Sequence, residues 1–263
     1  MVVWGFGWGG GLGVVVRTAG IRWGSLMVKR PFPLLAGNPG RAVHSCPEAS
    51  LLSVGVDPVV VEQMLVDGRL RCPDCGGVLA RWGWAAARFV RVVAGGVKRV
   101  RLRRAICPDG GGCGRSHVLL PRFLLGRRLD EVDVIWSVLR ARAGGWGWRR
   151  AVRWAVRPAS TVRGWLTRFA GRAQMIRHGF AGLERLVSAA GGGDMDRLVP
   201  AGGVLGDAVA QIGVCLAAVR RGWGGSVFTV SPAQVVAVLS GGWLLGRRGL
   251  RVTGLWINTS PHL

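Results

Sequence analysis

Hydrophobic and polar residues alternate most regularly between residues 130 and 172, where apolar side chains recur every three or four positions. This spacing predicts three helices in succession. Their apolar stripes are Val132, Ile135, Trp136, Leu139 and Ala143 in the first, Ala151, Val152, Ala155 and Val156 in the second, and Val162, Trp165, Leu166 and Phe169 in the third. Two short helices, a tight turn and an amphipathic third helix indicate a helix-turn-helix over residues 128–175.

Turn and cap residues set the expected ends of these helices. Asp130 is expected to cap the first helix, and Gly144-Gly145 to end it. The second helix runs from Trp148 to Val156 and cannot continue through Arg157-Pro158. We expect Ser160 to cap the third helix, which begins at Thr161 and extends to about Arg172.

Upstream, residues 78–106 alternate in part between apolar and polar positions, with Gly95-Gly96 at the centre. This pattern predicts a β-hairpin with arginines on its polar side. The apolar positions are Phe89, Val90, Val92, Val97, Val100 and Leu102.

Downstream, the pattern predicts a helical tail over residues 179–246, with helices at 180–190, 204–219 and 232–245. The longest uncharged run, residues 222–246, contains the capping box Ser231-Pro232-Ala233-Gln234, which starts a short helix in its middle. We therefore expect no membrane span. Residues 1–50 and 247–263 are expected to be irregular, the first of them disordered or an upstream start-site artefact. The predicted fold class is α+β, with a small β-hairpin module followed by an all-α part.

Cysteine spacing suggests a chemistry for the hairpin module. Cys72 and Cys75 form a C-x2-C turn that directs two thiolates at one point, and Cys107 and Cys113 follow the hairpin. Four such sulfurs suit a structural Zn²⁺ ion, and two knuckles bracketing β-hairpins make a zinc ribbon, here over residues 65–122. Cys46 and Cys215 have no partner at knuckle spacing and are expected to be buried or incidental thiols.

The second knuckle leaves alternatives open, because five residues separate Cys107 from Cys113 instead of two. Doubling a small loop adds only about 0.6 kcal/mol of closure entropy, whereas structural zinc contributes on the order of 10–16 kcal/mol in finger peptides. His117 is a competing ligand and would give a set of three cysteines and one histidine. A third alternative is that no metal is held stably.

Charge is concentrated in the same part of the chain. The net charge is +23, and residues 72–178 hold 22 of the 36 basic residues and 5 of the 13 acidic ones. Such a field attracts polyanions, and we expect double-stranded DNA as the partner. The third helix would enter the major groove, with Arg163 as the best guanine contact. The predicted DNA-binding residues are Ser160, Thr161, Arg163, Thr167, Arg168 and Arg172 on that helix, and Arg99, Arg101, Arg103 and Arg104 on the hairpin.

Three segments carry a resemblance to a known family: CPDCGGVLARWGW, CGRSHVLLPRFLL and RPASTVRGWLTRF. Over roughly residues 65–175 the chain is similar to an uncharacterised family from high-GC bacteria that combines a transposase-type zinc ribbon with a helix-turn-helix. The resemblance implies a DNA-binding protein linked to mobile elements or transcription regulation. In that family the second knuckle is a short C-x2-C-G followed by Thr-His or Ser-His, so the wide loop before Cys113 is a departure.

Two other functional classes are weighed against DNA binding. A truncated or accessory transposase would need three gathered carboxylates, and the candidates are Glu184, Asp194, Asp196 and Asp207. About 85 residues follow the predicted helix-turn-helix, too few for a ribonuclease H-like fold, so we expect no enzymatic activity. The second alternative is a protein-interaction module. In that case the many arginines would reflect the codon bias of a GC-rich gene and not a role in binding DNA. We expect a cytoplasmic, nucleoid-associated protein, with a second copy or a transposase as further partner.

Overall fold

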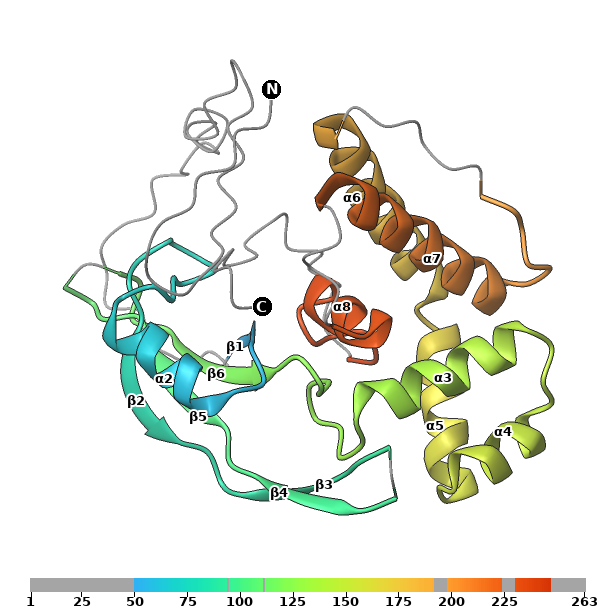
Figure 1. The fold of residues 1–263 in the computed structure, drawn as a ribbon, viewed down its shortest axis with the longest axis horizontal. Coiled ribbons are helices and arrows are strands. Elements are labelled where there is room, and N and C mark those ends of the chain that lie inside the picture. The colour runs from blue at the N-terminus through green and yellow to red at the C-terminus, as the bar shows by residue number, and fades with distance from the viewer. Residues whose placement is uncertain (1–49, 94, 111, 192–197, 224–229, 247–263) are drawn as a thin grey trace, which may run out of the picture. The chain divides into compact units, whose positions relative to one another are not determined.

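The computed structural model describes residues 50–93, 95–110, 112–191, 198–223 and 230–246, and these form a mixed α+β fold (Figure 1). The strands are β1 (Ser50–Val54), β2 (Ala80–Trp84), β3 (Arg88–Arg91), β4 (Val97–Val100), β5 (Arg103–Ile106) and β6 (Ser116–Pro121). The helices are α2 (Pro58–Val66), α3 (Val132–Ala143), α4 (Trp148–Ala155), α5 (Ala159–Ala170), α6 (Ala173–Gly191), α7 (Val204–Trp223) and α8 (Pro232–Leu239). The expectations for residues 1–49 and 247–263, Cys46 included, lie outside the described residues.

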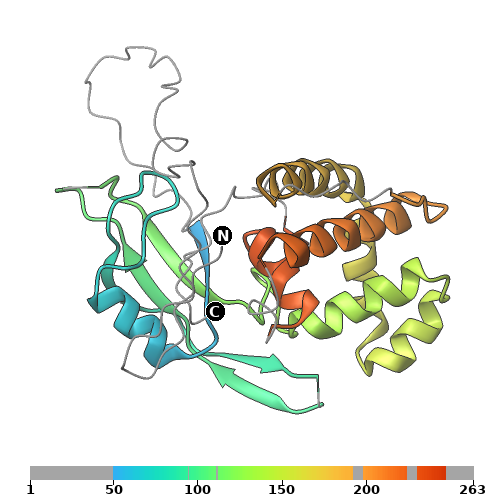
Figure 2. The same cartoon turned by 45° about the horizontal axis from the view of Figure 1, so that its top comes forward.

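The predicted hairpin is present and consists of two successive strand pairs. Strands β2 and β5 pair antiparallel within a four-stranded sheet of order β1-β6-β5-β2, and β3 and β4 continue as a separate antiparallel pair (Figure 2). Gly95 and Gly96 make the turn, with Gly95 at φ +82. On the inner face Val90, Val100 and Leu102 are buried against the segment after β6. Phe89 and Val97, two of the apolar positions in the alternating pattern, lie on the other face and are exposed.

Strand β1 and helix α2 were not predicted. β1 pairs parallel with β6, with Ser50 opposite His117. Asp57 caps helix α2, because its side chain accepts a hydrogen bond from the Val59 amide at 2.8 Å. Pro58 occupies the first position of the helix. Val61, Met64 and Leu65 of α2 pack with the buried residues of the sheet. The β module therefore has a hydrophobic core of its own beside the cysteines.

Helix α2 is also joined to the sheet through Glu62. This carboxylate pairs with Arg81 on β2 and, through both oxygens, with Arg103 on β5 at 2.9 and 3.1 Å. The Arg103 side chain is only 12% exposed, so its guanidinium is engaged in this pair.

Helices α3 to α8 share one hydrophobic core. Helices α6 and α7 pack along one another, and α3 contacts α4, α5, α7 and α8. The predicted stripes on α3 and α5 are largely buried: Val132, Ile135, Trp136 and Leu139 on α3, and Val162, Trp165 and Phe169 on α5. On α4, Ala151 and Ala155 are buried, but Val156, predicted to belong to that helix, lies just beyond its end and is exposed. The predicted boundary between residues 175 and 179 falls inside α6, which starts seven residues before the expected Phe180.

The start of helix α8 was predicted correctly, but its end was not. Ser231 caps α8, since its hydroxyl accepts from the Gln234 amide at 3.2 Å, as the capping box predicts. The helix stops at Leu239 and not at residue 245, because Gly241 and Gly242 adopt φ of +57 and +76. Among the described helices, none combines the length and apolarity that crossing a bilayer requires.

Candidate metal centre and basic surface

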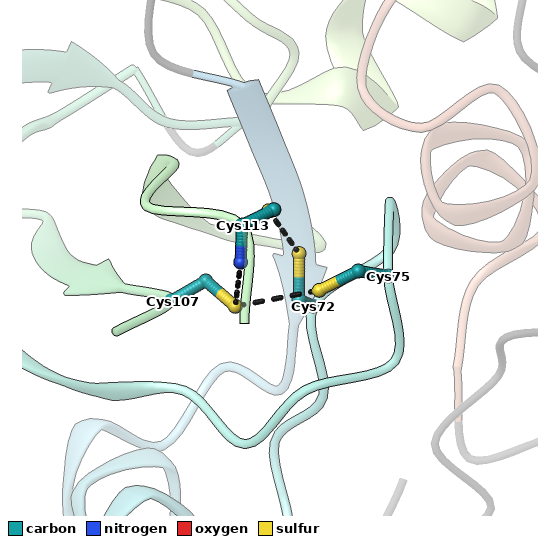
Figure 3. Close-up of side chains that lie close together, drawn as sticks. All are labelled: Cys72, Cys75, Cys107 and Cys113. Atoms are coloured by element: carbon teal, nitrogen blue, oxygen red, sulfur yellow. Dashed lines mark hydrogen bonds between the residues drawn. The ribbon is translucent and has the colours of Figure 1, made fainter. Parts of the chain in front are cut away.

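The first cysteine pair lies in a tight turn just before β2. The Cys72 amide donates to the Gly77 carbonyl at 2.8 Å, and the Gly76 amide donates to the Cys72 carbonyl at 2.9 Å. Gly76 has φ +76, a left-handed conformation that glycine adopts without a Cβ clash. The turn brings the side chains of Cys72 and Cys75 to the same side of the chain (Figure 3).

The second pair lies between β5 and β6. The Cys107 amide donates to the Arg115 carbonyl at 2.8 Å, and the Cys113 amide donates to the Cys107 sulfur at 3.3 Å. The longer loop thus keeps one of the N–H to sulfur hydrogen bonds of a short knuckle. A Cβ on Gly112 would collide with the Cys107 sulfur and lie 2.8 Å from the Pro108 carbonyl oxygen, so the loop closes only with glycine at that position.

All four sulfurs come together. Cys72 Sγ is 3.6 Å from Cys113 Sγ, and Cys75 Sγ is 3.5 Å from Cys107 Sγ (Figure 3). The four sulfur atoms lie within 4.8 Å of one another. The edge of a tetrahedron with metal–sulfur bonds near 2.3 Å is about 3.8 Å, whereas a disulfide bond is about 2.05 Å. The four cysteines are therefore spaced as metal ligands and could bind a metal ion.

The surroundings of the sulfurs affect their protonation. Burial raises the pKa of Cys72 to about 12 and also raises the pKa of Cys107. The Gly77 amide, which hydrogen-bonds to the Cys75 sulfur, lowers the pKa of Cys75 to about 7. A bound cation would hold all four sulfurs as thiolates, because metal coordination displaces the thiol protons.

His117, the alternative ligand, lies on β6 and is fully buried beside the cysteines. Its Nε2 is 3.4 Å from Cys72 Sγ, and its Nδ1 hydrogen-bonds with the Ser50 hydroxyl on β1. Burial lowers the pKa of His117, so the imidazole is neutral. Two arrangements satisfy both contacts. With a protonated Cys72 thiol, Sγ–H donates to Nε2 and Nδ1–H donates to the Ser50 hydroxyl. With a Cys72 thiolate, as metal binding requires, Nε2–H donates to the sulfur and the Ser50 hydroxyl donates to Nδ1.

An ion pair joins the two cysteine turns. Arg115 Nη1 lies 3.1 Å from the carboxylate of Asp74, the residue just before Cys75, and this carboxylate raises the pKa of Arg115. The pair holds the second turn against the first from outside the sulfur cluster.

Asp130 was expected to cap α3, and that prediction is wrong. The N-cap position is Glu131, and its side chain makes no capping hydrogen bond. The Asp130 carboxylate is instead buried, with Oδ2 2.7 Å from Arg91 Nη2 and Oδ1 2.7 Å from Arg157 Nε. It cannot turn toward the helix amides because both oxygens are engaged.

The Asp130 cluster connects three segments far apart in the sequence. Arg91 ends β3, Arg157 lies in the turn between α4 and α5, and Asp130 precedes α3. Arg157 also donates to the Val92 carbonyl at 3.1 Å, and the Val93 amide donates to Glu131 at 2.9 Å. The tip of the β3–β4 hairpin is thereby attached to the three-helix unit.

Helix α5 begins at Ala159, two residues earlier than expected, so Ser160 does not cap it. Pro158 occupies the N-cap position, and its carbonyl accepts from the Thr161 and Val162 amides. Ser160 is exposed in the first turn, and Thr161 is half-buried. The turn before the helix contains Val156 at φ +51, an uncommon conformation for a β-branched residue.

The predicted DNA-binding residues of α5 divide into two groups. Arg163, Thr167 and Arg168 are exposed, and the Arg163 guanidinium lies 4.8 Å from the ring centre of Trp148 on α4. Arg172 is half-buried and donates to the carbonyls of Trp243 and Gly246, so it fastens the segment after α8.

The hairpin arginines divide in a similar way. Arg99 and Arg101 are exposed, and Arg101 lies 5.7 Å from the ring centre of Trp84. Arg104 is half-buried, and Arg103 is held by Glu62. Of the arginines predicted to contact DNA, the exposed ones are therefore Arg99 and Arg101 on the hairpin and Arg163 and Arg168 on α5.

Of the four carboxylates weighed for strand-transfer chemistry, the structure describes two, and each accepts a hydrogen bond from a neighbouring group. Glu184 is buried and accepts from Gln211 at 2.7 Å, and Asp207 accepts from the Ala201 amide at the start of α7. Asp194 and Asp196 lie outside the described residues. Cys215 is buried in the helical core, where burial and the Glu184 carboxylate raise its pKa to about 12.

Three roles were not predicted from the sequence: the hydrogen bond of Ser50 with His117, the buried ion pairs of Asp130, and the close approach of Gly112 to the Cys107 sulfur. The partners of these residues lie between 5 and 67 residues away in sequence. The Asp57-Pro58 pair is the one local signal that would have found α2 and, with it, the added core beside the cysteines.

A domain of unknown function (DUF6431) is found at residues 72–149. This span contains all four cysteines, the hairpin, Asp130 and helix α3, and it ends at the start of α4. Neither the curated proteins nor the solved structures contain a significant match to the chain.

Proposed function

We propose that the chain is a DNA-binding protein in which a zinc ribbon and a helix-turn-helix act together. The proposal rests chiefly on α5, which buries Val162, Trp165 and Phe169 and exposes Arg163, Thr167 and Arg168. A three-residue turn separates α4 from α5, which is the usual length in a helix-turn-helix. In this proposal α5 enters the major groove, with Arg163 directed at a guanine edge.

Zn²⁺ is the proposed ion at Cys72, Cys75, Cys107 and Cys113. Four thiolates at tetrahedral spacing suit zinc, and a site with four protein ligands is structural and not catalytic. The ion would order the two turns that bracket the hairpin. Arg99 and Arg101 would then contact the phosphate backbone, which positions a protein on DNA without reading sequence.

The cellular role proposed is that of a targeting module or regulator linked to mobile DNA, acting in the cytoplasm on the nucleoid. Its partner besides DNA would be a second copy or a transposase. The rival classes remain distinct in their predictions. An accessory transposase would nick or join supercoiled DNA with Mg²⁺ or Mn²⁺, and a protein-interaction module would show no affinity for duplex DNA.

The proposal is tested by fluorescence anisotropy with the full chain and a labelled duplex. Arg163→Ala should weaken binding by at least about tenfold, because hydrogen bonds to charged groups contribute about 1.5–3 kcal/mol each. Arg185→Ala on α6 removes the same charge from an exposed position outside this surface and should have little effect. Equal affinities for wild type and Arg163→Ala would argue against α5 as the contact.

A further inference from the structure

A pocket of about 640 Å³ lies between the C-terminal half of α5, the segment before α3 and the segment after α8. Four arginines line it: Arg127, Arg128, Arg168 and Arg172. The pocket is also lined by Thr167, whose side chain has a hydroxyl group, and by Met175 and Trp243. Among the described residues that line the pocket, none is aspartate or glutamate.

Arg128 is one of the two half-buried arginines of the pocket. It is half-buried and donates one hydrogen bond from Nη2 to the Leu245 carbonyl at 2.9 Å. Its Nε is buried and makes no hydrogen bond to any described group. Burial lowers the pKa of Arg128, and the positive charge of Arg168 lowers it further. The fold therefore holds guanidinium groups close together at a cost in electrostatic repulsion.

Backbone strain at the preceding residue, Arg127, adds to this cost. Arg127 has φ +60, in the left-handed region that residues other than glycine seldom adopt. Neutral side chains at these positions would avoid the repulsion, and glycine would avoid the backbone strain. A bound anion would offset the repulsion between the guanidinium groups, because a nearby opposite charge favours the charged form of each.

We propose that this pocket binds a phosphate group. Guanidinium forks match the oxygens of phosphate in bidentate pairs, and a threonine hydroxyl can donate to a third oxygen. The phosphate would come either from the DNA backbone or from a small phosphate-bearing ligand. The DNA form of this inference rests on the proposed function, since Thr167 and Arg168 belong both to the pocket and to the exposed face of α5.

The test uses the full chain, a double variant and a charge-matched control. Arg127→Gly and Arg168→Gln together remove two guanidinium groups, and glycine at 127 suits the left-handed backbone, so the fold should be preserved. Arg140→Gln with Arg185→Gln removes two positive charges from exposed positions outside the pocket. Calorimetric titration with inorganic phosphate and with pyrophosphate at constant ionic strength gives the affinity of each protein.

Wild type and control should bind pyrophosphate, and the double variant should bind it at least about tenfold more weakly. If duplex affinity falls in the double variant and pyrophosphate competes with the duplex, the phosphate is that of the DNA backbone. If phosphate binding falls while duplex affinity is unchanged, the ligand is a small phosphate-bearing molecule. Both results support the pocket.

The inference is overturned if the double variant binds phosphate, pyrophosphate and duplex as wild type does. In that case a loss of duplex affinity in Arg163→Ala would leave the proposed function standing. Conversely, pocket-dependent phosphate binding in a chain that binds no duplex would contradict the proposed function and leave the pocket intact.

Discussion

Gly112 shows how a single residue can decide whether the wide second knuckle closes. Three glycines separate Asp109 from Cys113, and such a run would ordinarily be interpreted as a flexible spacer. At position 112 the backbone passes so near the Cys107 sulfur that no Cβ fits, whereas a Cβ at Gly110 would meet nothing within 4 Å. The glycines of this loop therefore have different roles.

This difference predicts different effects of the same substitution. Gly112→Ala should displace Cys107 or Cys113 and reduce bound zinc well below the one ion per chain expected of the wild type, while Gly110→Ala should retain it. Metal content of the purified variants, measured by mass spectrometry, checks the prediction. Full zinc occupancy in Gly112→Ala would show that the wide loop does not supply ligands.

The choice between Cys107 and His117 is also made at the scale of residues. Cys107→Ser should lose zinc, because it removes one of four sulfurs at ligand spacing. His117→Ala should retain zinc but lower the melting temperature, because it removes a fully buried ring and its hydrogen bond with Ser50. The opposite result, zinc retained in the first variant and lost in the second, would assign the fourth ligand to His117.

At the scale of elements, the hairpin and the three-helix unit are joined through one buried carboxylate. Asp130 is 3% exposed and Arg157 is 6% exposed, so water screens their interaction little. Arg91, on β3, is 35% exposed and contributes less. The hairpin that holds Arg99 and the unit that holds helix α5 therefore share an ionic contact.

Removing this carboxylate should be costly. Asp130→Ala leaves Arg157 buried without its anion, and losing one partner of a buried ion pair costs about 3–5 kcal/mol of unfolding free energy. Asp133→Asn, in the first turn of α3, is the matched control and should cost less than about 1 kcal/mol, the usual size of a helix-dipole interaction. Urea denaturation compares the two variants. A similarly small change in both would mean that the Asp130 cluster contributes little to stability.

Local signals explain which elements could be predicted from the sequence. The stripe on α5, the Gly95-Gly96 bend and the Cys72–Cys75 turn depend on neighbours within a few residues. Strand β1 could not be found in this way, because its pairing partner β6 lies more than 60 residues away and nothing in Ser50–Val54 specifies it. For the same reason the positions of Arg103 and Arg172 were misjudged: their partners, Glu62 and Trp243, are distant in sequence.

At the scale of the whole molecule, the positive charge is unevenly distributed and partly neutralised. Of the arginines expected to contact DNA, Arg103 is paired with a carboxylate, and Arg172 is bound to carbonyl groups. Arg99, Arg101, Arg163 and Arg168 remain exposed. The DNA-binding account therefore depends on about four exposed guanidinium groups and not on the formal net charge of +23.

The affinity of the zinc-loaded chain for a random duplex, measured between about 50 and 200 mM NaCl, tests the central claim most directly. Each phosphate neutralised contributes about −0.9 to the slope of log affinity against log salt concentration, so the three exposed arginines that are not directed at a base, Arg99, Arg101 and Arg168, predict a slope of about −2.7. The same series with Arg99→Ala should give a slope smaller by about one. Absence of duplex binding across the whole series, or an affinity that does not change with salt, would contradict the account.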